Sequence, residues 1–204
     1  MNVAQAVGRA LADAGVSHVF GVVGSGNFHV TNAMVEAGST FVAARHEGGA
    51  ATMADAFARM SDTVAAVTVH QGCGLTNAMT GIAEAAKSRT PLVVLAAEVT
   101  ETRSNFYVDQ AALATSVGAL SRRITSAEAA VDEARAAVSL ARDQRRTVVL
   151  NLPLKVQAAS AASTPQRSDS ESGHLPRSAD PAGLDVLLRA LQEAERPVFV
   201  AGRG

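Results

Sequence analysis

The stretch VAARHEGGAATMADAFARM, residues 42–60, reads as the end of a strand, a tight turn and the start of a helix. Small and apolar residues lead up to Arg45, His46 and Glu47, two glycines follow, and the apolar side chains beyond them recur at helical spacing. Glu47 therefore stands where an apolar strand ends and a nearly uncharged helix begins. In parallel α/β sheets this edge, at the carboxyl ends of the strands, is where ligands bind.

The same alternation of a short apolar segment and an amphipathic helix continues on both sides of this stretch. Because parallel strands need crossover connections, the pattern predicts an α/β fold, a doubly wound six-stranded parallel sheet with helices on both faces. Strands are predicted at residues 17–23, 40–44, 63–69, 91–97, 117–124 and 147–153. Helices are predicted from Asn2 to Gly15, over 28–37, after Glu47, from Thr76 to Lys87 and from Ala127 to Asp143.

Composition and charge narrow the class of protein. Hydrophobic residues make up 48% of the 204 residues and aromatic residues only 3%, which favours a core of Ala, Val and Leu. The net charge is −1 and the basic residues are scattered, so no nucleic-acid or membrane partner is expected. One cysteine, no apolar run of membrane-spanning length and an N-terminal helix that does not resemble a signal peptide together predict a cytoplasmic protein.

The chain divides into regions of different composition. Residues 1–157 carry the alternating pattern and are predicted to form one domain. Residues 158–180 are rich in Ser, Ala and Pro without an apolar period, which is typical of a linker. Residues 181–204 read as a capped helix followed by a strand that runs into glycines. A strand needs neighbouring strands to pair with. This last region is therefore expected to be the start of a second, central domain, of which the sequence contains only the first part.

The first of three predicted ligand-binding loops is GVVGSGNF, residues 21–28. Its glycines are spaced G-x-x-G-x-G rather than G-x-G-x-x-G, and no acidic residue ends the second strand, where a ribose hydroxyl would need one. Both features argue against nicotinamide or flavin binding. A tight turn in which glycine supplies positive φ and a loop that contacts a ligand remain equally open.

The second loop is RHEGG, residues 45–49. His46 and Glu47 begin like the zinc motif H-E-x-x-H, but Ala50 stands where the second histidine belongs, so no metal site is expected. Glu47 is either a carboxylate that the helix dipole stabilises by about 0.3–1 kcal/mol or an acid with a chemical role. The small and apolar residues around it predict an enclosed, crowded setting, which favours a carboxyl group able to share a proton.

The third loop is VHQGCGLTN, residues 69–77. Asn77 or Thr76 can cap the following helix, and Cys73 is most simply a small buried hydrophobic residue. His70 lies at the carboxyl end of a strand, where a structural role and a catalytic role are equally open.

Together the three loops resemble those of the N-terminal, pyrimidine-binding domain of thiamine-diphosphate-dependent enzymes that act on 2-oxo acids. The resemblance runs from the first helix to residue 153, and the region after residue 158 resembles the linker and central-domain start of the same family. The segments that carry it are VFGVVGS (19–25), RHEGGAATMADAFAR (45–59), QGCGLTNAMTGIAEA (71–85) and RTPLVVLAA (89–97).

The resemblance implies a chemical role for Glu47. In this family a glutamate hydrogen-bonds the pyrimidine nitrogen of thiamine diphosphate and favours the imino tautomer, which removes the thiazolium proton. The resulting ylid adds to the keto carbon of a 2-oxo acid and carbon dioxide leaves. The enamine is then protonated or transferred to a second carbonyl compound.

The resemblance also implies roles for other loop residues. Ser25 and His70 match an active-site serine and histidine of benzoylformate decarboxylases, which makes His70 a second candidate catalytic residue, while RHEGGAA and GLTNAMTGI are closer to acetolactate synthases. Gln110 is a candidate substrate contact. Two positions differ from the family pattern, since Val23 and Cys73 stand where proline is common. The candidate cofactor-binding residues are Glu47, Gly72, Cys73, Gly74, Asn77, Val23 and Gly24.

The family implies partners as well. Its members bind the diphosphate and magnesium through a Gly-Asp-Gly signature followed by Asn on another domain, usually of a neighbouring subunit, and this sequence contains no such signature. A homodimer or homotetramer is therefore expected, formed through the helices after Glu47 and Thr76. The alternatives are a noncatalytic flavodoxin-like module that binds a ligand or partner, and one subunit of a two-subunit 2-oxo acid decarboxylase.

Overall fold

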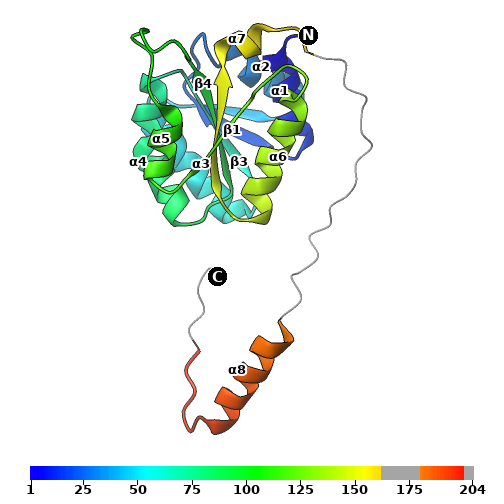
Figure 1. Ribbon diagram of the computed structural model, residues 1–204, viewed down its shortest axis with the longest axis vertical. Coiled ribbons are helices and arrows are strands. Elements are labelled where there is room, and N and C mark those ends of the chain that lie inside the picture. Colours follow the sequence, from blue (N-terminus) through cyan, green and yellow to red (C-terminus); the bar gives the residue numbers. More distant parts are fainter. Residues whose placement is uncertain (162–179, 200–204) are drawn as a thin grey trace. The chain divides into compact units, whose positions relative to one another are not determined.

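The computed structural model describes residues 1–161 and 180–199, and a single parallel sheet organises the first of these two ranges (Figure 1). Its strands are β1 (His18–Gly21), β2 (Thr40–Ala43), β3 (Ala65–Val69), β4 (Leu92–Glu98), β5 (Leu120–Arg123) and β6 (Thr147–Pro153). The strand order is β2-β1-β3-β4-β6-β5, and each adjacent pair is parallel. The chain moves from β1 outward to β2 and then crosses back to β3, which is the doubly wound arrangement that the sequence predicts.

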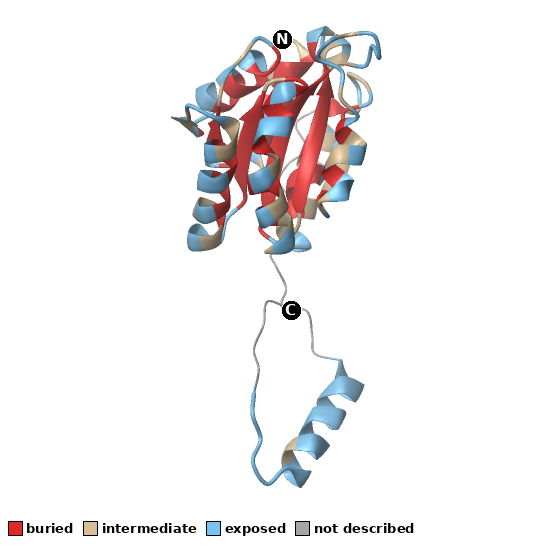
Figure 2. Ribbon diagram, turned by 90° about the vertical axis from the view of Figure 1, so that its left-hand side faces the viewer, coloured by how far each residue is buried: buried red, intermediate tan, exposed pale blue. Residues whose placement is uncertain are grey.

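Helices cover both faces of this sheet. On one face α1 (Val3–Asp13), α2 (Phe28–Glu36) and α6 (Ala130–Asp143) contribute to one apolar cluster. On the other, α3 (Glu47–Ser61), α4 (Cys73–Lys87) and α5 (Gln110–Ser116) contribute to a second. Figure 2 shows that the strands are buried between the helices and that the helix residues facing away from the sheet are exposed. The predicted fold class is therefore confirmed.

Some element boundaries differ from the prediction. α4 begins at Cys73 rather than Thr76, because Gly72 already turns the chain into the helix, and α6 begins at Ala130 rather than Ala127. Two short helices, α5 and α7 (Leu154–Ala158), were not predicted. With seven and five residues they are too short to show a helical period in the sequence.

Small residues allow α3 and α4 to pack unusually close to each other. A Cβ added to Gly81 on α4 would lie 2.5 Å from the Cβ of Ala51 on α3, which is closer than real carbon atoms approach. Ala54 and Ala78 are buried on the same two helices. The Ala-rich composition thus brings the N-terminal ends of two neighbouring helices together at the carboxyl edge of the sheet.

A buried carboxylate ties the other ends of these helices together. Asp55 on α3 is only 6% exposed, and it accepts hydrogen bonds from Arg59 Nε at 2.9 Å and from the Thr90 hydroxyl at 2.6 Å. Arg59 also reaches Glu84 on α4 at 3.0 Å. Its hydrogen bond with Asp55, and next that with Glu84, raises the pKa of the Arg59 guanidinium.

Residues 180–199 are described separately from the sheet domain, because the chain divides into Met1–Pro165 and Gln166–Gly204. α8 (Pro181–Glu193) begins after Asp180, whose carboxylate accepts a hydrogen bond from the Ala182 amide at 3.2 Å. The strand predicted after this helix is absent from residues 194–199, since no neighbouring strand pairs with it there. Most of the predicted linker and the last five residues lie outside the described residues. Within the described ranges, no helix combines the length and apolar character needed to cross a membrane.

Replacing the buried carboxylate should weaken the sheet domain. Asp55→Ala leaves the Thr90 hydroxyl, 1% exposed, without its acceptor, while Arg59 keeps Glu84. We expect a loss of about 1–3 kcal/mol in the free energy of unfolding, measured by urea denaturation of the 204-residue chain. Glu36→Ala is the matched control, because its ion pair with Arg9 is exposed and should change stability by no more than about 0.5 kcal/mol. Equal effects of the two variants would contradict the role of Asp55.

Candidate functional site

The three candidate loops meet because their strands are neighbours. β1 lies between β2 and β3 in the sheet, with Gly21 opposite both Ala43 and Thr68 at their carboxyl ends. The loops that follow these strands therefore start side by side at the point where the strand order reverses. This is the position at which open α/β sheets bind ligands.

Glu47 is the first residue of α3 and contacts α4 across the helix pair. Its Oε2 accepts a hydrogen bond from Asn77 Nδ2 at 3.0 Å, and its Oε1 lies near the place where a side chain of Gly74 would project, 3.5 Å from the ideal Cβ position. The predicted enclosure of Glu47 is wrong for this chain, because the side chain is only half-buried. The preceding strand, β2, lies at the edge of the sheet, and Arg45, His46 and Gly49 around the start of α3 are exposed.

His46 explains how α3 begins. It occupies the N-cap position with extended backbone, and its Nδ1 accepts a hydrogen bond from the Gly48 amide at 3.0 Å. The histidine thus satisfies an amide that the helix itself leaves unpaired. His46 therefore has a structural role at the start of α3.

The third loop turns at Gly72, which corrects two predictions. Gly72 has φ +63°, and a side chain there would collide with the carbonyl of Phe106. Since α4 starts directly after it, neither Thr76 nor Asn77 caps the helix: the Thr76 hydroxyl donates to the Cys73 carbonyl at 2.9 Å, within the first turn. Cys73 is exposed rather than buried, because as the first helical residue it faces outward.

His70 connects the third loop to the first. Its half-buried ring accepts a hydrogen bond at Nδ1 from the Gly26 amide at 3.3 Å, and its edge packs against Phe106 with the ring centres 5.7 Å apart. Because Nδ1 is the acceptor, the neutral ring carries its proton on Nε2. A Cβ on Gly74 would also lie 3.2 Å from the His70 Cβ, so Glu47 and His70 approach the same glycine.

The first loop presents Val23 and Ser25 to solvent, with Gly24 half-buried between them. Of the two alternatives left open for this loop, the turn with positive φ does not hold at Gly24 and Gly26, because neither is among the positive-φ residues. Their small size serves close packing instead: a Cβ on Gly24 would lie 2.8 Å from His70 Nδ1, and one on Gly26 would collide with Gln71.

Asn27, which the sequence reasoning missed, fixes this first loop. It is 1% exposed; its Oδ1 accepts from the Gly24 amide at 2.7 Å, and its Nδ2 donates to Thr68 at 2.9 Å and to the Val22 carbonyl at 3.1 Å. The available signal was a polar amide just before a predicted helix, which is typical of a turn or cap. Phe106 was also missed, because nothing in the sequence places its loop over His70.

Gln110 lies beneath the third loop rather than beside an open surface. The side chain is 2% exposed, its Nε2 donates to Asn151 Oδ1 at 2.8 Å, and its Oε1 faces the Gly72 amide at 3.5 Å. Asn151 in turn donates to the Arg122 carbonyl at 2.9 Å. Because the amide of Gln110 is engaged within the chain, its position favours a supporting role over the predicted substrate contact.

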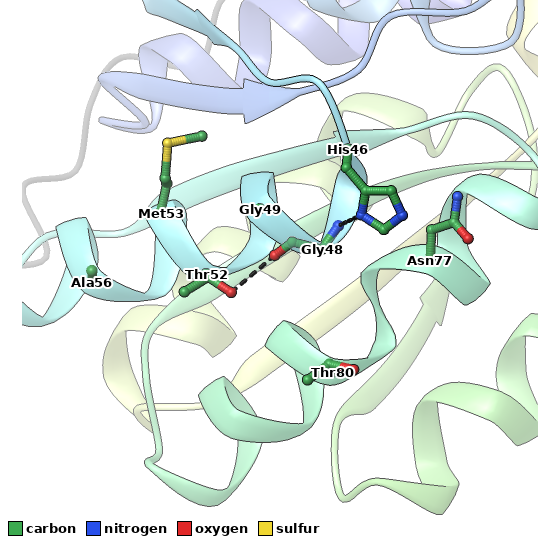
Figure 3. A pocket seen from close by; sticks show the side chains of 8 residues that line it. All are labelled: His46, Gly48, Gly49, Thr52, Met53, Ala56, Asn77 and Thr80. Atoms are coloured by element: carbon green, nitrogen blue, oxygen red, sulfur yellow. Dashed lines mark hydrogen bonds between the residues drawn. The ribbon is translucent and has the colours of Figure 1, made fainter.

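A groove runs between α3 and α4 from the end where Glu47 contacts Asn77. Its volume is about 590 Å³. Figure 3 shows Met53 and Ala56 further along α3, and Thr80 further along α4. The lining residues are His46, Gly48, Gly49, Thr52, Met53, Ala56, Asn77 and Thr80.

These features define a domain of the doubly wound α/β class, with an acid, a histidine and a glycine-rich turn gathered at the carboxyl edge of the sheet. The sequence matches the protein family described as "Thiamine pyrophosphate enzyme, N-terminal TPP binding domain" over residues 1–120. Because this match covers more than half of the chain, the chain belongs to that family.

Two individual proteins with similar sequences are an acetolactate synthase subunit and a probable 2-ketoarginine decarboxylase. Acetolactate synthase isozyme 3 large subunit of Escherichia coli K12 is 43% identical over 97 residues, which cover 47% of this chain and 17% of that protein. A probable 2-ketoarginine decarboxylase of Pseudomonas aeruginosa is 31% identical over 217 aligned positions, which cover 100% of this chain and 38% of that protein. This chain therefore spans well under half of either relative.

A solved structure shares the fold. The thiamine diphosphate-dependent 4-hydroxybenzoylformate decarboxylase of Rhodococcus jostii RHA1 superposes with a TM-score of 0.80 at 25% sequence identity. The match covers 97% of this chain and 38% of that enzyme. The similarity thus extends over the domain described above.

Proposed function

We propose that this chain holds the aminopyrimidine half of thiamine diphosphate in an enzyme that decarboxylates a 2-oxo acid. The product is then either released after protonation or joined to a second carbonyl compound. One observation carries the proposal: the carboxylate of Glu47 stands at the carboxyl edge of the sheet with Oε2 held by Asn77 and Oε1 beside Gly74. Within the described ranges, Oε1 has no hydrogen-bond partner.

The residues present fit a flat heteroaromatic ring. Gly74 leaves the space between Glu47 and His70 without a side chain: a Cβ there would lie 3.5 Å from Glu47 Oε1 and 3.2 Å from the His70 Cβ. A carboxyl oxygen without a partner suits a ring nitrogen that shares a proton. When bound, thiamine diphosphate supplies the carbanion that attacks the keto carbon of the substrate.

In this proposal the chain's own residues hold and move protons. Glu47 shares a proton with the ring nitrogen through Oε1, while Asn77 keeps Oε2 occupied. His70 offers the proton on Nε2 to the substrate side, because its Nδ1 is engaged with Gly26. Ser25 is exposed on the neighbouring loop and is the second candidate for substrate contact, with Val23 and Gly24 lining the cofactor side.

The rest of the site belongs to other parts of the enzyme. We propose that another domain, on a neighbouring copy in a homodimer or homotetramer, supplies the groups that hold the diphosphate and magnesium. The groove between α3 and α4 supports this, because Met53 in its lining is 38% exposed. Outside the groove lining, Met60 of α3 is 88% exposed. Exposed apolar side chains of this kind are typical of an interface. A cytoplasmic location is part of the same proposal.

Removing the acid should abolish most turnover. In the enzyme assembled with its diphosphate-binding domain, Glu47→Gln should slow exchange of the thiazolium proton with deuterium oxide, and turnover with it, by at least ~10²-fold. The helix should still form, so the far-ultraviolet circular dichroism should not change. Exchange at the unaltered rate would reduce Glu47 to a residue that serves only the helix dipole.

Removing the histidine should separate the two possible product routes. If the product is released after protonation, His70→Ala should slow decarboxylation by at least ~10²-fold while cofactor affinity falls less. If the product is joined to a second carbonyl compound, the ratio of condensation to simple decarboxylation should stay nearly constant. Both rates are measured with pyruvate and benzoylformate, and His29→Ala on the exposed face of α2 is the control. Normal rates for His70→Ala with each accepted substrate would remove His70 from the mechanism.

The groove face should mediate self-association. We expect the 204-residue chain to form dimers in sedimentation experiments as concentration rises, and Met53→Glu to shift the equilibrium toward monomer because it places a charge in the groove. Val35→Glu is the control, since Val35 has a similar exposure of 45% but lies on α2, whose core side packs on the opposite face of the sheet. A chain that stays monomeric at high concentration would contradict the proposed interface.

A further inference from the structure

The contact between the Glu47 and Asn77 side chains depends on how closely the backbones of α3 and α4 pack. Behind them, Gly81 packs against Ala51, and a Cβ on Gly48 would lie 3.2 Å from the Asn77 carbonyl oxygen. The N-terminal ends of α3 and α4 are therefore held at a set separation. That separation leaves room for one hydrogen bond of 3.0 Å between the side chains.

The chemistry of the pair defines which atoms meet. An ionised carboxylate only accepts hydrogen bonds, so the atom of Asn77 that faces Oε2 is the amide nitrogen. An amide donates to the carboxylate without adding a charge. It therefore orients Glu47 while leaving the carboxyl group free to take up a proton at its other oxygen.

The geometry points to Asn77 as the positioning residue of Glu47. By occupying Oε2, Asn77 turns Oε1 toward Gly74 and the side of His70, where the floor of the site has no side chain. The contact itself is a property of this chain. Its importance for catalysis rests on the proposed function.

The contact can be tested on the 204-residue chain without a cofactor. In ¹H–¹⁵N spectra of side-chain amides, the Asn77 signal, assigned by its loss in Asn77→Asp, should move as the pH is lowered and the carboxylate it donates to is protonated. The same signal should shift in Glu47→Gln and then lose most of its pH dependence. The Asn32 amide, exposed on α2, is the internal control and should respond to neither change. An Asn77 signal that is insensitive to both pH and Glu47→Gln would overturn the contact.

A second measurement tests the positioning role in the assembled enzyme. Asn77→Ala should slow thiazolium proton exchange by at least ~10-fold, with a smaller change in cofactor affinity, because the carboxylate remains but loses its orientation. Asn32→Ala should leave the exchange rate unchanged. An Asn77→Ala enzyme with unaltered exchange would overturn the positioning role. Absence of exchange in the unaltered enzyme would overturn the proposed function instead, and the spectra of the isolated chain would still decide whether Asn77 holds Glu47.

Discussion

The close packing of α3 on α4 is the constraint from which the site follows. Gly81 and Ala51 let the two helices approach until no larger side chain would fit between them. Since both helices start at the carboxyl edge of the sheet, this approach brings Glu47 of one to Asn77 of the other. Asp55 and Arg59 hold the same helix pair further along, through Glu84 and Thr90. The position of the acid is therefore set by packing of small residues at some distance from it.

The remaining site residues depend on polar contacts that the loops make with the sheet. Asn27 joins the first loop to Thr68 on β3, and Gln110 links the third loop to Asn151 on β6. These amides are buried and hydrogen-bonded within the domain, so losing either partner of such a bond would cost stability. By contrast, Glu47, His70 and Ser25 keep part of their side chains accessible. The domain thus separates groups that build the loops from groups that are free to meet a ligand.

The sequence predicted the fold class and the meeting of the three loops, because six short apolar segments alternating with helices leave few other arrangements. It did not predict that Gly72 starts α4, since positive φ is a property of the folded turn and glycines in the first loop looked equally suitable. The expected enclosure of Glu47 failed for a different reason. Burial depends on which strand lies at the sheet edge, and a local pattern of small residues does not contain the strand order. Contacts distant in sequence, such as Phe106 on His70, were equally invisible.

The bond between Gly26 and His70 has a consequence for how the two loops are linked. Nδ1 accepts from the Gly26 amide through its lone pair, so the bond fixes the ring form in which Nε2 carries the proton. The loop that carries Val23 and Ser25 is anchored both by this bond and by Asn27. A displacement of the third loop that moves His70 would therefore also move the first loop through the Gly26 amide.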